Sequence, residues 1–198
     1  HRREYTHPTN PDIAGLNLHL SDYTYDVKYN FNLGNDFETT FGVNGQYQNN
    51  TIGDATDFPI PAYHQFDIGP FFIMKKTFGK LDLEGGARFD SRSITTKDAF
   101  IDTAVAFYPT LYTNASTATP PTVVQQFAGF SKTFSGATGS FGATYNFSPA
   151  FLIKANIARG FRAPSIAELS ANGPDPGSQI YHVGDANFKP EFNVQTDI

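Results

Sequence analysis

The stretch Phe37-Glu38-Thr39-Thr40-Phe41-Gly42-Val43-Asn44-Gly45-Gln46-Tyr47-Gln48 alternates two kinds of residue along its whole length. Its odd positions carry Phe, Thr, Phe, Val, Gly and Tyr, and its even positions are polar or Gly. Because successive side chains of a β-strand point to opposite faces, this pattern predicts a strand with one apolar face. The pattern lasts for about nine residues or more, close to the roughly 9–11 residues of a tilted membrane-spanning strand, whereas strands of soluble domains average about 5–6.

The same alternation recurs at 23–31, 81–90, 139–147 and 151–157, with Leu152 and Ala158 as apolar residues out of phase. The charged residues of these segments lie on the face opposite the apolar one: Asp26, Lys28, Glu38, Asp82, Glu84, Arg88 and Lys154. One side of each predicted strand is therefore suited to lipid and the other to water or polar protein groups.

Two segments depart from a clean alternation. Residues 64–76 are apolar in both phases and include Pro70, which cannot donate to a central ladder, so we expect a bulge or a strand facing a plug there. The first strand changes phase between Leu20 and Tyr23, and one bulge would account for that change.

The connections between the predicted strands alternate in length. Those at 32–36, 78–80 and 148–149 are tight, whereas those at 49–63, 91–130 and 162–188 are long. Transmembrane barrels have short periplasmic turns and longer extracellular loops. We therefore predict an all-β, antiparallel transmembrane β-barrel, with strands near 16–31, 65–77, 131–147 and 188–198 running inward and strands near 37–49, 81–92 and 150–161 running outward.

The composition and the absence of certain motifs argue against several classes of function. The chain has 198 residues, a formal net charge of −5, no cluster of Lys and Arg and no Cys. We therefore expect no nucleic-acid partner, disulfide or thiolate metal site. It has no apolar run of about 18 residues or more, so no transmembrane helix is expected. No nucleophile elbow, zinc-protease, P-loop or dinucleotide motif occurs, so we expect neither an enzyme nor a bound cofactor.

A longer motif resembles a known family. The run Gly160-Phe161-Arg162-Ala163-Pro164-Ser165, followed by Glu168-Leu169, Asn172-Gly173, Gly184 and Lys189-Pro190-Glu191, resembles the signature of the barrel of TonB-dependent outer-membrane receptors. Gly86-Ala87-Arg88-Phe89-Asp90 is similar to a strand end of the same family. We expect the signature residues to be architectural, with Arg162 pairing with Glu168 or Glu191 at the rim and Pro164 and Pro190 fixing the chain direction. Those residues are Arg88, Asp90, Arg162, Pro164, Glu168, Lys189, Pro190 and Glu191.

The resemblance implies a barrel of about 22 strands around a plug. The roughly seven strands predicted here cannot close it, since even the smallest bacterial barrels use about eight. We therefore expect 1–198 to be a partial barrel domain of a longer receptor, without its plug, its TonB-contacting segment or its final strands. This expectation leaves two alternatives open: a small non-transporting barrel used in adhesion or structure, and a soluble carbohydrate-binding β-sandwich.

The function implied by the resemblance is import across the bacterial outer membrane of a scarce ligand: an iron-siderophore, haem or another metal complex. The implied partners are outer-membrane lipid, TonB with its inner-membrane complex, the ligand and an accessory surface lipoprotein. Loops held by a rigid scaffold usually carry binding groups. The candidate ligand-binding residues are Asp175, Gln179, Tyr181 and His182 in the loop 172–187, and His64. No His-x-His or His-x3-His spacing occurs, so we assign no metal site.

Overall fold

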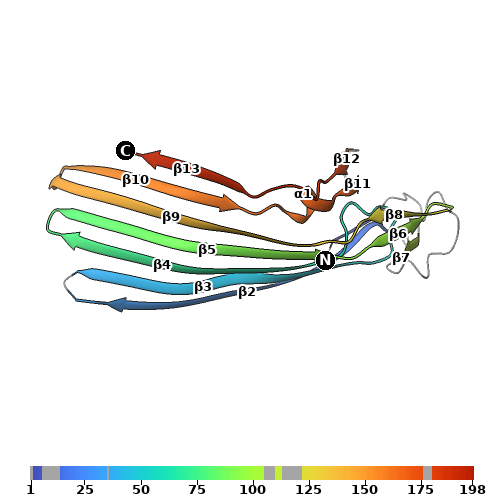
Figure 1. The fold of residues 1–198 in the computed structure, drawn as a ribbon, viewed down its shortest axis with the longest axis horizontal. Coiled ribbons are helices and arrows are strands. Elements are labelled where there is room, and N and C mark those ends of the chain that lie inside the picture. Colours follow the sequence, from blue (N-terminus) through green and yellow to red (C-terminus); the bar gives the residue numbers. More distant parts are fainter. Residues whose placement is uncertain (1, 6–13, 35, 105–109, 113–121, 176–179) are drawn as a thin grey trace.

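The computed structural model describes residues 2–5, 14–34, 36–104, 110–112, 122–175 and 180–198. Its main element is an eight-stranded antiparallel sheet in the order β1-β2-β3-β4-β5-β9-β10-β13 (Figure 1). These strands are β1 Arg2–Tyr5, β2 Ala14–Asn32, β3 Phe37–Ile52, β4 Tyr63–Phe78, β5 Leu81–Thr96, β9 Ser131–Ser148, β10 Phe151–Arg162 and β13 Glu191–Asp197. Neighbours along the chain are neighbours in the sheet, apart from the excursions between β5 and β9 and between β10 and β13.

The seven predicted strands are present, and β1 adds an eighth that the sequence did not suggest. Among the described strands, β1 and β13 each pair on one side only. With 19 and 18 residues, β2 and β9 are longer than the roughly 9–11 needed to cross a bilayer. The sheet is therefore tall enough to span a membrane and to extend beyond it.

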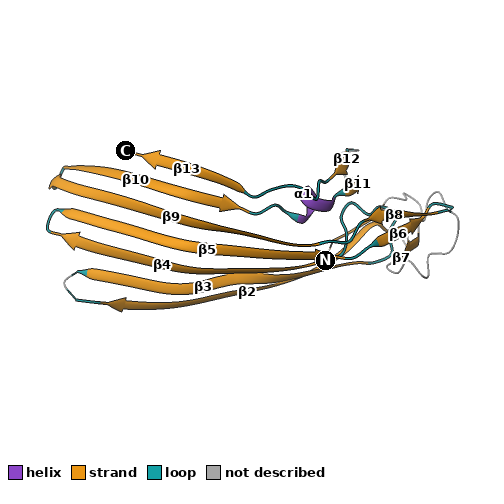
Figure 2. Cartoon of the chain, viewed as in Figure 1, coloured by secondary structure: helices purple, strands orange, loops and turns teal. Residues whose placement is uncertain are grey.

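Short turns and long connections lie at opposite ends of the sheet, as predicted (Figures 1 and 2). The β4–β5 turn joins the register partners Phe78 and Leu81 through two residues, and Gly79 has a φ of 59° there. A positive φ is costly for a residue with a Cβ atom, so Gly suits this position. The other end carries the only described helix, α1 Ile166–Ser170.

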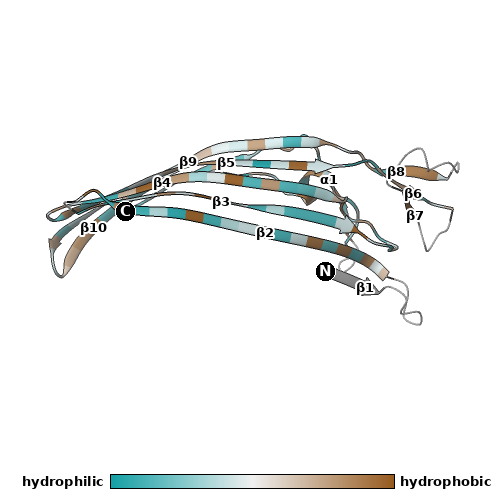
Figure 3. Cartoon of the chain, turned by 90° about the horizontal axis from the view of Figure 1, so that it is seen from below, coloured by the Kyte–Doolittle hydropathy of each residue, from teal (hydrophilic) through white to brown (hydrophobic). Residues whose placement is uncertain are grey.

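Cross-strand register collects the apolar side chains on one face of the sheet. Val27 lies opposite Val43, and Tyr29 opposite Phe41, which in turn faces Phe72. We call this the apolar face; Figure 3 shows hydrophobic and hydrophilic residues interleaved along the strands. Many of its large side chains are exposed, including Tyr23, Val27, Tyr29, Phe41, Phe66, Ile68, Met74, Phe89, Phe141, Tyr145, Ile153, Ile157 and Val194. An exposed apolar surface on this scale is typical of a face that contacts lipid or another protein.

The opposite side, which we call the polar face, carries Lys28, Asn44 and Arg88 among others. Neither predicted bulge is present, and the alternative for 64–76, a strand facing a plug, stays a prediction. The β2–β3 register runs without a shift from Leu18–Ile52 to Asn32–Glu38. The apolar residues before Tyr23 instead belong to the part of β2 that lies beside a loop, where Ala14 and Leu16 are buried.

Pro70 also causes no bulge. It pairs with Val43 on one side, while the β4–β5 pairing skips Gly69 and Pro70 and resumes at Phe71–Arg88 in the same register. Since proline has no N–H to donate, the ladder toward β5 is interrupted without an added residue. Phe71 and Ile73 consequently lie on the polar face. Across the sheet they are in register with Lys28 and Asn30, respectively.

The segment 91–130, which we predicted as one long loop, contains regular structure. β5 continues to Thr96, and β6 Ala99–Asp102, β7 Thr110–Tyr112 and β8 Val123–Phe127 form a separate three-stranded sheet in the order β7-β6-β8. Phe58, Ala99 and Phe127 form a small core under it. Farther along, β11 Asn172–Pro174 and β12 Tyr181–Val183 form a two-stranded hairpin. No helix among the described residues is long and apolar enough to cross a membrane.

Candidate functional site

Helix α1 packs on the sheet at the end opposite the tight turns. Its Ile166 and Leu169 join a buried cluster with Tyr63, Ile94 and Phe134 from β4, β5 and β9. Ile94 is fully buried, and Leu169 is 2% exposed. Ile94 is two residues from Arg92 and so shares the polar face. The connection after β10 therefore folds inward over that face at the rim of the sheet.

The helix begins where the sequence supplies a cap. Ser165 accepts a hydrogen bond from the backbone N–H of Glu168 at 3.3 Å, and Glu168 Oε2 accepts from the Ser165 backbone N–H at 2.8 Å. This reciprocal arrangement is a capping box, which stabilises the first turn of a helix. Pro164, just before the cap, is fully buried, in keeping with a role in directing the chain.

The signature arginine joins both predicted partners at once. Arg162 donates from Nη1 and Nη2 to the two oxygens of Glu168 at 2.9 and 2.8 Å, and from Nε to Glu191 Oε2 at 2.9 Å. The Arg162 hydrogen bonds, followed by those from Ser165, lower the pKa of Glu168 from 4.5 to about 2. The end of β10, the helix and the start of β13 are thus held at one guanidinium, which confirms the predicted pairing.

The other signature residues occupy distinct places. Arg88 Nε lies 2.6 Å from Asp90 Oδ1, and its guanidinium lies 6.0 Å from the centre of the Phe71 ring. Lys189 is exposed and Pro190 partly buried where the chain enters β13. The architectural role of these residues remains a prediction.

Sequence reasoning missed a second polar cluster, centred on Asp67. Arg92 donates from Nε and Nη2 to the two Asp67 oxygens at 2.9 and 2.8 Å, and Gln46 and Gln65 each donate to Oδ2 at 3.0 Å. Because 64–76 is apolar in both phases, the sequence did not show on which face of the strand Asp67 lies. The alternate residues Arg88, Asp90 and Arg92 of β5 were the feature of the sequence that could have indicated a charged cluster on this face.

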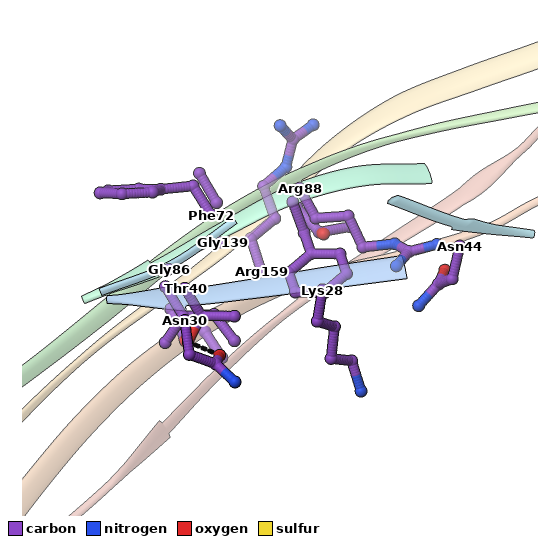
Figure 4. Close-up of a pocket in the computed structure, with 15 residues that line it drawn as sticks. Lys28, Asn30, Thr40, Asn44, Phe72, Gly86, Arg88, Gly139 and Arg159 are labelled. Atoms are coloured by element: carbon purple, nitrogen blue, oxygen red, sulfur yellow. Dashed lines mark hydrogen bonds between the residues drawn. The ribbon is translucent and has the colours of Figure 1, made fainter. Parts of the chain in front are cut away.

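A shallow hollow of about 600 Å³ lies along the middle of the sheet. Lys28, Asn30, Thr40 and Asn44 contribute polar lining, and Asn30 Oδ1 accepts a hydrogen bond from Thr40 at 2.8 Å. In Figure 4, Phe72 points to the opposite side of the sheet from Lys28 and Asn30. The hollow therefore lies mainly on the polar face, where a barrel keeps its lumen.

The predicted ligand residues are only partly brought together. His182 Nε2 lies 3.9 Å from Asp175 Oδ2, and Tyr181 donates its hydroxyl to Asn172 Oδ1 at 2.9 Å. Gln179 lies outside the described residues. His64 belongs to β4 and not to this hairpin, and it lies on the apolar face with Nδ1 3.3 Å from the Tyr47 hydroxyl. No group of three or more His, Cys, Asp or Glu in the described part of the chain is arranged to hold a metal ion.

A tall antiparallel sheet with an uncovered apolar face, a polar face and short turns at one end is part of the wall of a transmembrane β-barrel. The chain belongs to the TonB-dependent receptors: the family model described as "TonB dependent receptor-like, beta-barrel" matches residues 2–198. This assignment confirms the resemblance and replaces the β-sandwich alternative. The family comprises outer-membrane receptors of bacteria rather than enzymes.

A solved structure has the same fold. It is a double mutant of the Serratia marcescens hemophore receptor HasR in complex with its hemophore HasA and haem, with a TM-score of 0.55 and 13% identity. The match covers 88% of this chain and 28% of that HasR chain. No curated protein sequence matches the chain.

Proposed function

We propose that this chain is part of the barrel of an outer-membrane receptor that imports a scarce ligand, energised by TonB and its inner-membrane complex. Membership of the TonB-dependent receptor family is the observation that carries the proposal. The polar face, with its Arg88–Asp90 and Asp67–Arg92 pairs, is suited to line a hydrated lumen. The inward-folded rim segment around α1 suits a receptor whose mouth is shaped to meet a ligand.

The ligand class we favour is a metal complex, either an iron-siderophore, haem or another chelate. The β11–β12 hairpin supports this choice, since Tyr181 and His182 are exposed and His182 stands beside Asp175. Imidazole and carboxylate groups bind metals and their chelates. HasR, the receptor of similar fold, is complexed with haem and a hemophore, which makes haem one of the ligands to test. An accessory surface lipoprotein is a further proposed partner.

Growth of a strain lacking the full-length gene tests the transport proposal. The strain is grown with ferric siderophore or haemin as the iron source, and separately under zinc limitation. We expect a defect under one of these conditions that the wild-type gene restores. If growth is unaffected under all three, the metal assignment is wrong.

Variants of the hairpin test the residues. His182→Ala with Asp175→Asn should restore growth only at raised ligand concentration, because capture at the surface is weakened. Asn187→Ala is the matched control, since this exposed residue of the same connection has no side-chain hydrogen bond among the described residues. Full growth with the hairpin variant at low ligand would remove these residues from the proposed site.

A further inference from the structure

Asn172, the first residue of β11, connects two other loops to its own hairpin. Its backbone N–H donates to the Pro59 carbonyl at 3.1 Å, in the β3–β4 connection. Its side-chain Nδ2 donates to the Gln126 carbonyl at 2.7 Å, and its backbone carbonyl accepts from Gln126 Nε2. Its Oδ1 accepts from the Tyr181 hydroxyl at 2.9 Å. Both backbone groups and both side-chain groups of Asn172 are therefore used.

Gln126 is free to make this contact because it is the extra residue of a bulge. In the β6–β8 pairing, Ala99 faces Phe127 and Phe100 faces Gln125, so Gln126 has no partner in β6. A bulge leaves one residue outside the ladder and re-aims its side chain. Here the bulged residue is the one that exchanges two hydrogen bonds with Asn172.

Two glycines show how closely the segments approach each other. A Cβ atom on Gly173 would lie 2.6 Å from the Phe58 carbonyl oxygen. A Cβ atom on Gly184 would lie 2.5 Å from the backbone nitrogen of Ser170 and 2.6 Å from that of Ala171. Since these are backbone atoms, a side chain at either position would force the segments apart.

The two sides of β11 have different partners. On one side β11 pairs with β12, where Gly173 faces His182 and Gly184 donates to the Ala171 carbonyl at 2.6 Å. On the other side Asn172 reaches Pro59 and Gln126. β11 thus makes the contacts with the β3–β4 and β5–β9 connections, whereas β12 carries the exposed groups.

We propose that Asn172 is a positioning residue that joins the β3–β4, β5–β9 and β10–β13 connections into one unit and so orients the hairpin bearing Tyr181 and His182. Its value for ligand capture rests on the proposed function, but the joint itself does not. The joint is made by neutral hydrogen bonds, whereas the Arg162 cluster is made by ion pairs.

A distance measurement on the full-length receptor tests the joint directly. Spin labels are placed at Val124→Cys on β8 and Val183→Cys on β12, both of which are exposed. The described chain has no native Cys to compete with them, and any Cys elsewhere in the receptor is replaced. We expect one narrow distance in the parent protein and its loss in Asn172→Ala. Amide exchange in β11 and β12 should become about tenfold faster, since two or more hydrogen bonds are lost.

Gln126→Ala supplies a second variant that breaks the joint from the other side, and it carries the test if Asn172→Ala does not assemble. Gln126→Ala removes the hydrogen bond from Gln126 Nε2 to the Asn172 carbonyl, whereas Asn172→Ala removes the two made by the Asn172 side chain. We therefore expect the double variant to be worse than either single one. Asn187→Ala is the control and should keep the narrow distance. A single narrow distance in both Asn172→Ala and Gln126→Ala would overturn the proposal, whether or not the receptor imports any tested ligand.

Discussion

Arg162 and Glu168 form a two-point pair in which both guanidinium Nη atoms meet both carboxylate oxygens, at 2.9 and 2.8 Å. The third donor of the same side chain, Nε, is used for Glu191. A lysine at this position would carry the charge without the planar fork, so it could not serve both carboxylates in this geometry. The shape of the arginine, as well as its charge, therefore holds α1 beside the ends of β10 and β13.

Arg162→Lys should loosen α1 while leaving the barrel folded. The pair is partly exposed, so solvent screens it and its contribution to stability is modest. We therefore expect amide exchange in α1 to accelerate by about fivefold, measured on the full-length receptor by mass spectrometry. Lys189→Ala removes an exposed cation nearby in the sequence and should leave exchange in α1 unchanged. Equal exchange in the parent and Arg162→Lys would contradict this role.

Low pH should release the same helix. The pKa of Glu168 is about 2 in the folded protein, against an ordinary value of 4.5, so the carboxylate stabilises the folded state fully above about pH 4.5. That contribution declines as pH falls from 4.5 through 2, because the unfolded segment takes up the proton first. Protection factors of the α1 amides, corrected for intrinsic exchange, should be constant from pH 7 to pH 5 and decline below. Glu168→Gln should flatten this dependence, and a decline that persists unchanged in that variant would assign it to another group.

Gly45 should tolerate no side chain. On the apolar face, Tyr25 crosses Gly45 to donate its hydroxyl to the Asp67 carbonyl at 2.9 Å. A Cβ atom at Gly45 would lie 1.9 Å from that carbonyl oxygen and 2.5 Å from the Tyr25 hydroxyl. We expect Gly45→Ala to cost about 1–3 kcal/mol, seen as a lower urea midpoint for the receptor in lipid vesicles. Gly85→Ala is the control, since its Cβ would lie 3.5 Å from its nearest neighbours; similar midpoints for the two variants would disprove the close approach.

Arginine should be rejected on the apolar face and accepted on the polar face. Val27 is 63% exposed on the former, and Asn44, beside Asp26 in the register, lies on the latter. Val27→Arg should cost about 2–4 kcal/mol if the residue lies near the middle of the bilayer. Asn44→Arg should cost little, because Asp26 offers a partner. The yield of assembled barrel in the outer membrane measures both, and equal yields would be inconsistent with the assignment of faces.

The sequence was sufficient for the long strands and insufficient for what lies between them. Alternation over 23–31 or 81–90 has a single physical cause, which is that one face of the strand lies in lipid. It can therefore be recognised in the sequence of one strand without knowing which strands pair with it. The phase change before Tyr23 was ambiguous, because a bulge and a loop covering Ala14 and Leu16 leave the same pattern. The short strand Ala99–Asp102 has too few residues to alternate, so the sheet β6–β8 was missed.

The candidate site was likewise predictable in one part and not in the rest. The pairing of Arg162 was predictable because its partners belong to one recognisable motif. Asn172 and Gln126 lie 46 positions apart, and Asp67 and Arg92 lie 25 apart, in segments whose relation only the register reveals. The glycines of the motif were visible in the sequence, but the backbone that each one approaches was not.

The most direct test of the central claim, that this chain forms barrel wall with one face in lipid, is a spin-label accessibility scan of β2. Single labels at each position of 23–31 in the full-length receptor, reconstituted in lipid vesicles, are exposed to oxygen and to a water-soluble nickel complex. Because strand side chains alternate in direction, oxygen accessibility should peak at Tyr23, Tyr25, Val27, Tyr29 and Phe31, and nickel accessibility at the residues between them. Loss of this alternation, or oxygen peaks at Asp26 and Lys28, would contradict the account.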